Sequence, residues 1–230
     1  MEAGTNSDAT AGPGDQRQPG PLRLGVVISG SGSNLQSIID RLHKSPAAVE
    51  VAVVISDNAE AYGLQRAEEA GIPTAVIPMK DYDSRINHDL AMADELARHN
   101  VDLVVLAGYM LIVTVALLDR FPYKVINLHP SLLPAFQGGT PIEDTIAHGA
   151  RVTGVTVHFV DEGTDTGPII LQEALEIKYN DTVESLRERI HAMEHVMLPR
   201  AIELIAAGRV RFDEANPQKV IIDAATGEET

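Results

Sequence analysis

The stretch LRLGVVISGSGSNLQSIIDRLHK, residues 22–44, decides the fold class. Residues 22–29 form an apolar run rich in Val and Ile, which is typical of a strand covered on both faces. A turn containing two glycines follows, and the residues after it have the apolar spacing of a helix. A strand, a tight turn and a helix in this order make the first half of a βαβ unit. The stretch therefore predicts a parallel sheet with right-handed crossovers.

The same alternation continues along the chain. We predict further strands at 49–56, 74–79, 101–109 and 123–130, and helices at 61–71, 84–100, 114–121 and 141–149. Two later runs, 152–161 and 167–177, alternate more clearly between apolar and polar residues, which indicates late antiparallel strands at a sheet edge. The predicted fold class is α/β: a Rossmann-like, mostly parallel twisted sheet with helices on both faces and late edge strands.

A long helix is predicted at 181–208, with Asp181 as its N-cap and Gly208 near its end. Pro199 and the pair Glu194-His195 indicate that its inner face is interrupted or polar. The 230 residues suffice for one substantial domain, which we place at 21–215. Residues 1–20 have the composition of a disordered lead-in, and 216–230 form a tail with one edge strand at 219–223.

Composition excludes several classes of function. The chain has 33 acidic residues against 18 Lys and Arg and a formal net charge of -15, so its surface repels nucleic-acid backbones. Because it has no cysteine, disulfides, thiolate zinc sites and cysteine nucleophiles are excluded, which fits a reducing cytoplasm. It has no apolar run long enough to span a bilayer. We expect a cytoplasmic protein without nucleic-acid or membrane partners, either a monomer or a homodimer.

The turn SGSGSNL, residues 29–35, has the character of an anion site. Its glycines let the backbone approach a ligand closely, and the helix behind it offers free N–H groups and the positive end of its dipole. It matches neither the P-loop nor the dinucleotide fingerprint. The alternative is a plain strand-to-helix turn that binds nothing.

Asn127 and His129 lie two positions apart at the end of the predicted strand VINLHP. Side chains at this spacing point to the same side of a strand, so both can face a cleft beyond the carboxyl ends of the sheet. Histidine serves as a general acid or base near neutral pH, and an asparagine amide can donate to an oxyanion. The alternative is a structural histidine with Pro130 ending the strand.

Two further positions carry acidic side chains that are candidates for a functional role. Asp165 lies in the acidic, glycine-bearing loop DEGTDTGP, and Glu194 lies on the last long helix. Each can equally be a solvated surface position. Three histidines, at 43, 88 and 99, fall in surface-type helical stretches and receive no role. No cluster of His, Asp and Glu has metal-ligand spacing, so we expect no metal ion.

Taken in order, these features resemble the folate-dependent formyltransferases over residues 22–210. The segments that carry the resemblance are ISGSGSNLQSIID, VVLAGYM, INLHPSLLP and VHFVDEGTDTGPII. The resemblance is strongest to the branch that formylates glycinamide ribonucleotide in purine biosynthesis. It implies formyl transfer from 10-formyltetrahydrofolate, as co-substrate, to the amine of 5'-phosphoribosylglycinamide, with no metal.

The resemblance also implies roles for individual residues. The catalytic residues of the family fall on Asn127, His129 and Asp165. The first two would stabilise the oxyanion, and Asp165 would favour the charged form of the histidine. The remaining family positions are those of ligand-binding residues. Phosphate-binding positions fall on Gly32, Ser33 and Asn34, the ribose contact on Glu194, and folate contacts on Arg85, Met110, Leu111, Ile112, Val113 and Asn127.

Two departures from the family pattern bear on specificity. Leu111 stands where the family usually has an arginine, and the segment GGTPI, residues 138–142, is similar to one in methionyl-tRNA formyltransferase. The alternatives are therefore a formyltransferase acting on another amine, a 10-formyltetrahydrofolate hydrolase, and a non-catalytic binding module. The acidic charge disfavours a tRNA substrate, and the three catalytic residue types disfavour the non-catalytic module.

Overall fold

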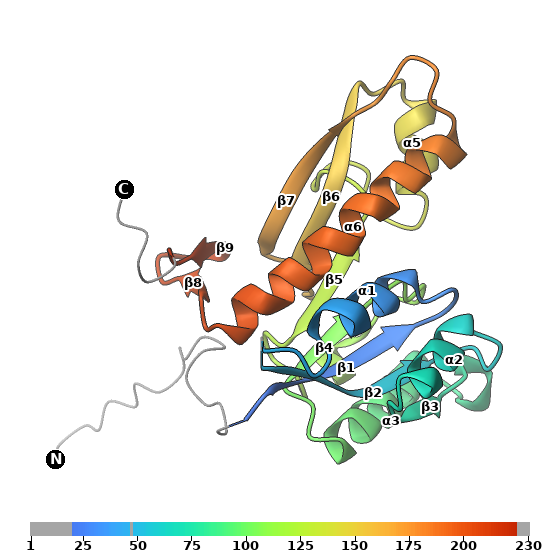
Figure 1. Cartoon of the computed structure of the whole chain (residues 1–230), viewed down its shortest axis with the longest axis vertical. Helices are drawn as coiled ribbons and strands as arrows, with labels where there is room; N and C mark the ends of the chain where they lie inside the picture. The colour runs from blue at the N-terminus through green and yellow to red at the C-terminus, as the bar shows by residue number, and fades with distance from the viewer. Residues whose placement is uncertain (1–19, 47, 225–230) are drawn as a thin grey trace, which may run out of the picture.

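The computed structural model describes residues 20–46 and 48–224, which form one sheet flanked by helices (Figure 1). The strand order is β3-β2-β1-β4-β5-β6-β7-β9-β8. The strands are β1 (Leu22–Ile28), β2 (Val49–Ser56), β3 (Thr74–Val76), β4 (Leu103–Leu106), β5 (Val125–His129), β6 (Val152–Phe159), β7 (Ile169–Glu176), β8 (Val210–Asp213) and β9 (Asn216–Ile222). The α-helices are α1 (Ser33–Leu42), α2 (Tyr62–Glu69), α3 (Arg85–Arg98), α4 (Val115–Leu118), α5 (Pro141–Ala147) and α6 (Val183–Ala206).

The first five strands are parallel to one another, as the pattern of residues 22–44 predicts. Strand β1 lies between β2 and β4, so the chain winds outward in one direction to β3 and in the other to β5. The loops that leave β1 and β4 therefore diverge at the carboxyl edge of the sheet. In open α/β sheets this switch point is where ligands bind.

The core explains why the early strands lack alternation. On β1, Leu24 and Val26 pack into a cluster that includes α1 and α6, while Val27 packs into another that includes α3 and α4. Both faces of the strand are therefore covered, and no charged or polar side chain occurs from Leu24 to Ile28. The expected α/β fold with helices on both faces is confirmed.

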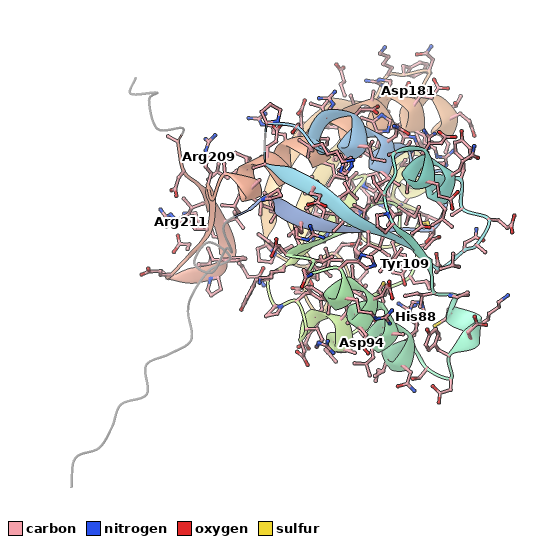
Figure 2. The ribbon with its side chains drawn as sticks, turned by 60° about the horizontal axis from the view of Figure 1, so that its bottom comes forward. His88, Asp94, Tyr109, Asp181, Arg209 and Arg211 are labelled. Atoms are coloured by element: carbon pink, nitrogen blue, oxygen red, sulfur yellow. The ribbon has the colours of Figure 1, made fainter. Side chains whose placement is uncertain are left out.

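The late strands differ in one respect from the expectation. Strand β6 is antiparallel to β5 and to β7, but β7 pairs in parallel with β9, and the edge of the sheet is formed by the hairpin of β8 and β9. The sequence predicted only one strand there, at 219–223. Arg209 and Arg211, labelled in Figure 2, hold the hairpin together because both side chains bond to Asp223.

Helix α6 corrects two expectations. Its N-cap is Thr182, whose hydroxyl accepts from the Ser185 N–H while the Ser185 hydroxyl accepts from the Thr182 N–H. Asp181, the predicted cap, instead accepts from the Lys178 N–H and pairs with Arg189. The helix also continues through Pro199 without interruption. Buried side chains on both sides of the proline hold the helix to the sheet, and this packing outweighs the lost hydrogen bond.

The division into a lead-in, a domain at 21–215 and a tail at 216–230 stays a prediction. Residues 1–19 of the lead-in and 225–230 of the tail lie outside the described residues. Within the described ranges, no helix combines the length and the apolar character that crossing a membrane requires.

Candidate active site

A cleft of about 750 Å³ opens at the carboxyl ends of β1, β4 and β5, where the topology places a ligand site. Its walls come from the loops after these strands, from the loop after β6, and from α5 and α6. The lining residues are 29–34, 106–113, 127–130, 138–139, 141–143, 158, 160–161, 163–165, 187, 191 and 194. The cleft therefore gathers almost all of the residues that the sequence singled out.

His129 is held at the end of β5 with its imidazole buried. Its Nε2 donates to the carbonyl oxygen of Phe136 at 2.8 Å, and its Nδ1 lies 3.4 Å from a carboxylate oxygen of Asp165. Both ring nitrogens thus face oxygen atoms that can accept a hydrogen bond. The contact with Asp165 is longer than an ordinary hydrogen bond, so Nδ1 can also contact a ligand.

Asp165 is fixed in a left-handed conformation with a φ of 54°, which aspartate tolerates better than most residues. Its Oδ2 accepts from the backbone N–H of Gly138 at 2.9 Å, and its carbonyl oxygen accepts from Gln137 at 3.2 Å. The segment 136–138 therefore holds both His129 and Asp165. The sequence predicted that Asp165 lies in a loop, and the structure brings that loop beside His129.

Asn127 points to the same side of β5 as His129. Its side-chain nitrogen lies 3.3 Å from Nε2 of His158 and 3.5 Å from Oδ1 of Asp165. His158 donates from Nδ1 to the Phe159 carbonyl at 2.8 Å, which leaves Nε2 to accept from Asn127. Burial lowers the pKa of His158, and the bond to Phe159 and the nearby Asp165 work against that effect. Asn127, His129, His158 and Asp165 together form what we call the polar corner.

Sequence reasoning missed His158. It lies on β6 directly opposite Asn127 in the β5–β6 register. The only sequence signal was a histidine inside a predicted strand, and the partner strand could not be known from the sequence.

The turn between β1 and α1 has the features of an anion site. Gly32 caps α1 with a φ of 68°, and no side chain caps the first turn, so its N–H groups are open to a ligand. A Cβ at Gly32 would lie 2.5 Å from the Cα of Gly63, which explains the glycine. Arg66 donates to the carbonyl of Ser31 and steadies the turn from α2.

Asn34 and Glu194 meet across the cleft. The Asn34 amide donates to Glu194 at 3.0 Å, while its own buried oxygen has no hydrogen-bond partner. Burial raises the pKa of Glu194, and the bond from Asn34 opposes that shift. The Asn34 side chain thus joins α1 to α6. The backbone N–H of Asn34 lies in the first turn of α1 and belongs to the anion site.

The residues expected to bind folate divide into two groups. Met110 and Ile112 are 69% and 66% exposed, and with Leu111 and Val113 they line the cleft. Arg85 lies behind this segment and is absent from the lining. Its guanidinium donates to the Ile112 carbonyl and lies 3.3 Å from Asp89, whose other oxygen accepts from the Thr114 N–H at 2.6 Å. Arg85 and Asp89 therefore brace the loop at 110–114.

His88 and Tyr109 belong to this bracing region (Figure 2). His88 was expected at the surface but is 1% exposed, and it bonds to Asp89 and to the Ile77 carbonyl. Burial raises the pKa of Tyr109 to about 12, against the influence of Arg85. The helical pattern around residue 88 did not reveal that this face turns inward. In the part of the chain that the structure describes, no group of His, Asp and Glu side chains could hold a metal ion.

Comparison with known proteins identifies similar sequences and structures. The model of the formyl transferase family matches residues 22–202. Phosphoribosylglycinamide formyltransferase of Bacillus subtilis (strain 168) is 39% identical over 193 residues, which cover 84% of this chain and 99% of that protein. Glycinamide ribonucleotide transformylase 1 from Symbiobacterium toebii superposes with a TM-score of 0.85 at 47% identity, covering 91% of this chain and 98% of that one.

Longer proteins match as well. The trifunctional purine biosynthetic protein adenosine-3 of Chironomus tentans is 47% identical over 194 residues, which are 84% of this chain. The chain spans 14% of that relative's length and 20% of its Bos taurus counterpart. The family model covers residues 22–202, which is more than half of the chain. The chain belongs to the formyl transferase family.

Proposed function

We propose that the chain transfers the formyl group of 10-formyltetrahydrofolate to the amine of 5'-phosphoribosylglycinamide, giving the formylated nucleotide of purine biosynthesis. The observation that carries the proposal is the polar corner in the cleft, where donors that make only long contacts lie beside the partly buried carboxylate of Asp165. Similarity to the B. subtilis and S. toebii proteins, whose names specify this nucleotide, supports the choice of substrate.

In this reaction the substrate amine attacks the formyl carbon, and the formyl oxygen takes the negative charge. The two donors nearest to such an oxygen are Nδ2 of Asn127 and Nδ1 of His129. Their contacts within the protein, at 3.3 to 3.5 Å, are long, so the reacting oxygen can recruit both donors without breaking a short hydrogen bond. Fixed donors aimed at developing charge are the main source of rate acceleration in acyl transfer.

Asp165 sets the charge of His129. Its carboxylate lies 3.4 Å from Nδ1, and a nearby negative charge favours the imidazolium, which stabilises an oxyanion better than a neutral ring does. As the intermediate collapses, the amine loses a proton and the folate nitrogen gains one. His129 and Asp165 are the titratable groups of the polar corner that can carry this proton.

The two substrates approach the polar corner from different walls. The N–H groups of Ser33 and Asn34 and the turn at Gly32 suit the phosphate, and Glu194 suits the ribose hydroxyls. The exposed apolar loop at 110–113 suits the flat, largely apolar face of the folate, with Arg85 holding the loop from behind. The enzyme would act on small molecules in the cytoplasm, as a monomer or a homodimer.

A product assay tests the proposal. Purified protein is incubated with 10-formyltetrahydrofolate, with and without 5'-phosphoribosylglycinamide, and formylated nucleotide and free formate are measured separately. We expect formylated nucleotide only when the nucleotide is present, and little formate. Formate release that does not depend on the nucleotide would instead identify a hydrolase. Formylation of a different amine would show that 5'-phosphoribosylglycinamide is not the substrate.

A further inference from the structure

The charges that line the cleft are unbalanced. Four carboxylates face it, from Glu143, Asp161, Asp165 and Glu194, whereas Arg187 is the only arginine or lysine among the described lining residues. The whole chain carries a net charge of -15. A phosphorylated substrate entering this cleft meets repulsion from most of its charged groups. Arg187, the one permanent cation in the lining, should therefore contribute strongly to the binding of a phosphate.

Arg187 is placed on the face of α6 that lines the cleft. Residues 187, 191 and 194 are spaced as i, i+4 and i+7, so they form one stripe along the helix. At 1.5 Å per residue, Arg187 lies about 10 Å along the helix axis from Glu194. Glu194 in turn is bonded to Asn34 at the start of α1. The long arginine side chain can span from its position toward the anion site at that helix start.

The guanidinium of Arg187 already has an anionic partner. It pairs with the carboxylate of Glu143, which comes from α5 and follows the unusual segment GGTPI. The two side chains are 39% and 46% exposed, and an ion pair so open to water contributes little to stability. Exchange of the carboxylate for a phosphate therefore costs little. A phosphate can also accept from two of the forked donors of a guanidinium, whereas Glu143 accepts from one.

We propose that Arg187 is a phosphate-binding and specificity-determining residue for the nucleotide substrate, and that Glu143 holds it at the cleft in the free protein. The proposal rests on the proposed function and adds a ligand contact that comes from α6 instead of from the turn at 29–35. Since Glu143 competes with the phosphate for the same guanidinium, its removal should strengthen nucleotide binding.

Steady-state kinetics with each substrate varied in turn test this role. We expect Arg187→Gln to raise the KM for 5'-phosphoribosylglycinamide about tenfold or more, because it removes a charge-assisted contact. The KM for 10-formyltetrahydrofolate should stay within about twofold, since that substrate binds at the opposite wall. Arg187→Lys keeps the charge but loses the fork, and its effect should be intermediate. Glu143→Gln should lower the KM for the nucleotide.

The matched control is Arg200→Gln, which removes one positive charge from the exposed side of the same helix, away from the cleft. It should leave both KM values unchanged. A second control is a substrate without the phosphate, glycinamide riboside, for which wild type and Arg187→Gln should have the same kcat/KM.

The outcomes separate this inference from the proposed function. If Arg187→Gln and Glu143→Gln raise both KM values equally, the pair is a structural tie between α5 and α6 and the inference is wrong. If the wild type formylates the nucleotide and Arg187→Gln has an unchanged nucleotide KM, the inference alone fails. If the wild type does not formylate the nucleotide at all, the proposed function fails and the inference fails with it.

Discussion

The polar corner and the loop at 110–114 lie in the same cleft but are built in opposite ways. In the corner, His129 and His158 are 4% and 1% exposed, and each ring already bonds to a backbone carbonyl. In the loop, Met110 and Ile112 are more than half exposed, and the loop is held by Arg85 and Asp89 behind it and by the Ser29 hydroxyl, which accepts from the Met110 N–H. The corner is assembled before any ligand binds, whereas the loop presents apolar surface that a ligand would cover.

The difference follows from the work each region has to do. Stabilising a developing charge requires donors that are already aligned, because reorganising them during the reaction would cost free energy. Binding a large flat ligand requires apolar area, and burial of that area upon binding supplies affinity without precise alignment. Changes in the corner should therefore lower kcat, and changes around the loop should raise the KM for the folate.

The largest effect is expected at His129. We expect His129→Ala to lower kcat by about three orders of magnitude, because it removes an oxyanion donor and a proton carrier together. Substrate binding should survive, since the side chain is assigned to the transition state. Titration calorimetry with each substrate alone, beside steady-state kinetics, measures both quantities. If the variant kept a kcat near that of the wild type, the catalytic role assigned to His129 would be wrong.

A smaller loss is expected for Asp165→Asn, about two orders of magnitude in kcat. The amide oxygen can still accept from the Gly138 N–H, so the loop should keep its shape, but the charge beside His129 is lost. The pH–rate profile should therefore change as well as the rate. A profile identical to that of the wild type would show that Asp165 does not set the charge of His129.

The loop offers the contrasting experiment. Arg85→Gln should raise the KM for 10-formyltetrahydrofolate about tenfold and change kcat by less than about threefold, because the loop loses the guanidinium that holds the Ile112 carbonyl. Thermal unfolding should be measured in parallel, since Asp89 is fully buried and loses a charge partner. The control is Arg98→Gln, an exposed position on the same helix. Equal losses in kcat for Arg85→Gln and Asp165→Asn would erase the distinction between the two regions.

The smallest effect concerns stability and comes from Glu194. Burial raises the pKa of this carboxyl above its ordinary value, so the folded protein binds the proton more tightly than the unfolded chain does. Its contribution to stability is fully present in acid and is lost as the pH rises through the folded-state pKa. Glu194→Gln removes the cost of the buried charge and offers a donor to the unpartnered oxygen of Asn34.

We therefore expect Glu194→Gln to raise the free energy of unfolding by about 1 kcal/mol near neutral pH, with a smaller gain in mild acid. Urea unfolding at both pH values measures the difference. The KM for the nucleotide should rise at the same time, because the ribose loses a charged acceptor. A variant that is less stable than the wild type near neutral pH would contradict the burial argument.

Much of the site could be predicted because it depends on local geometry. A period of two places Asn127 and His129 on one side of β5, and a glycine turn before a helix predicts the open N–H groups at Ser33 and Asn34. The parallel sheet followed from apolar runs without alternation. The loop containing Asp165 was recognised by composition, although its place beside His129 came only from the family resemblance.

The rest depends on contacts between distant parts of the chain. His158 meets Asn127 only because β6 pairs with β5 in one particular register. The anchors of His129 and Asp165 are backbone groups of Phe136 and Gly138, and a sequence pattern carries no signal for such atoms. Likewise, Arg85 lies behind the loop at 110–114 because Asp89, one turn further along α3, holds its guanidinium there.

The central claim is that His129 and Asp165 act as one unit in formyl transfer, and a double-mutant cycle on kcat tests it most directly. The four proteins are the wild type, His129→Ala, Asp165→Asn and the double variant, assayed for formylated nucleotide at saturating substrates. We predict that the double variant is about as slow as His129→Ala alone, because the carboxylate acts through the imidazole. A double variant whose loss equals the product of the two single losses would contradict the account.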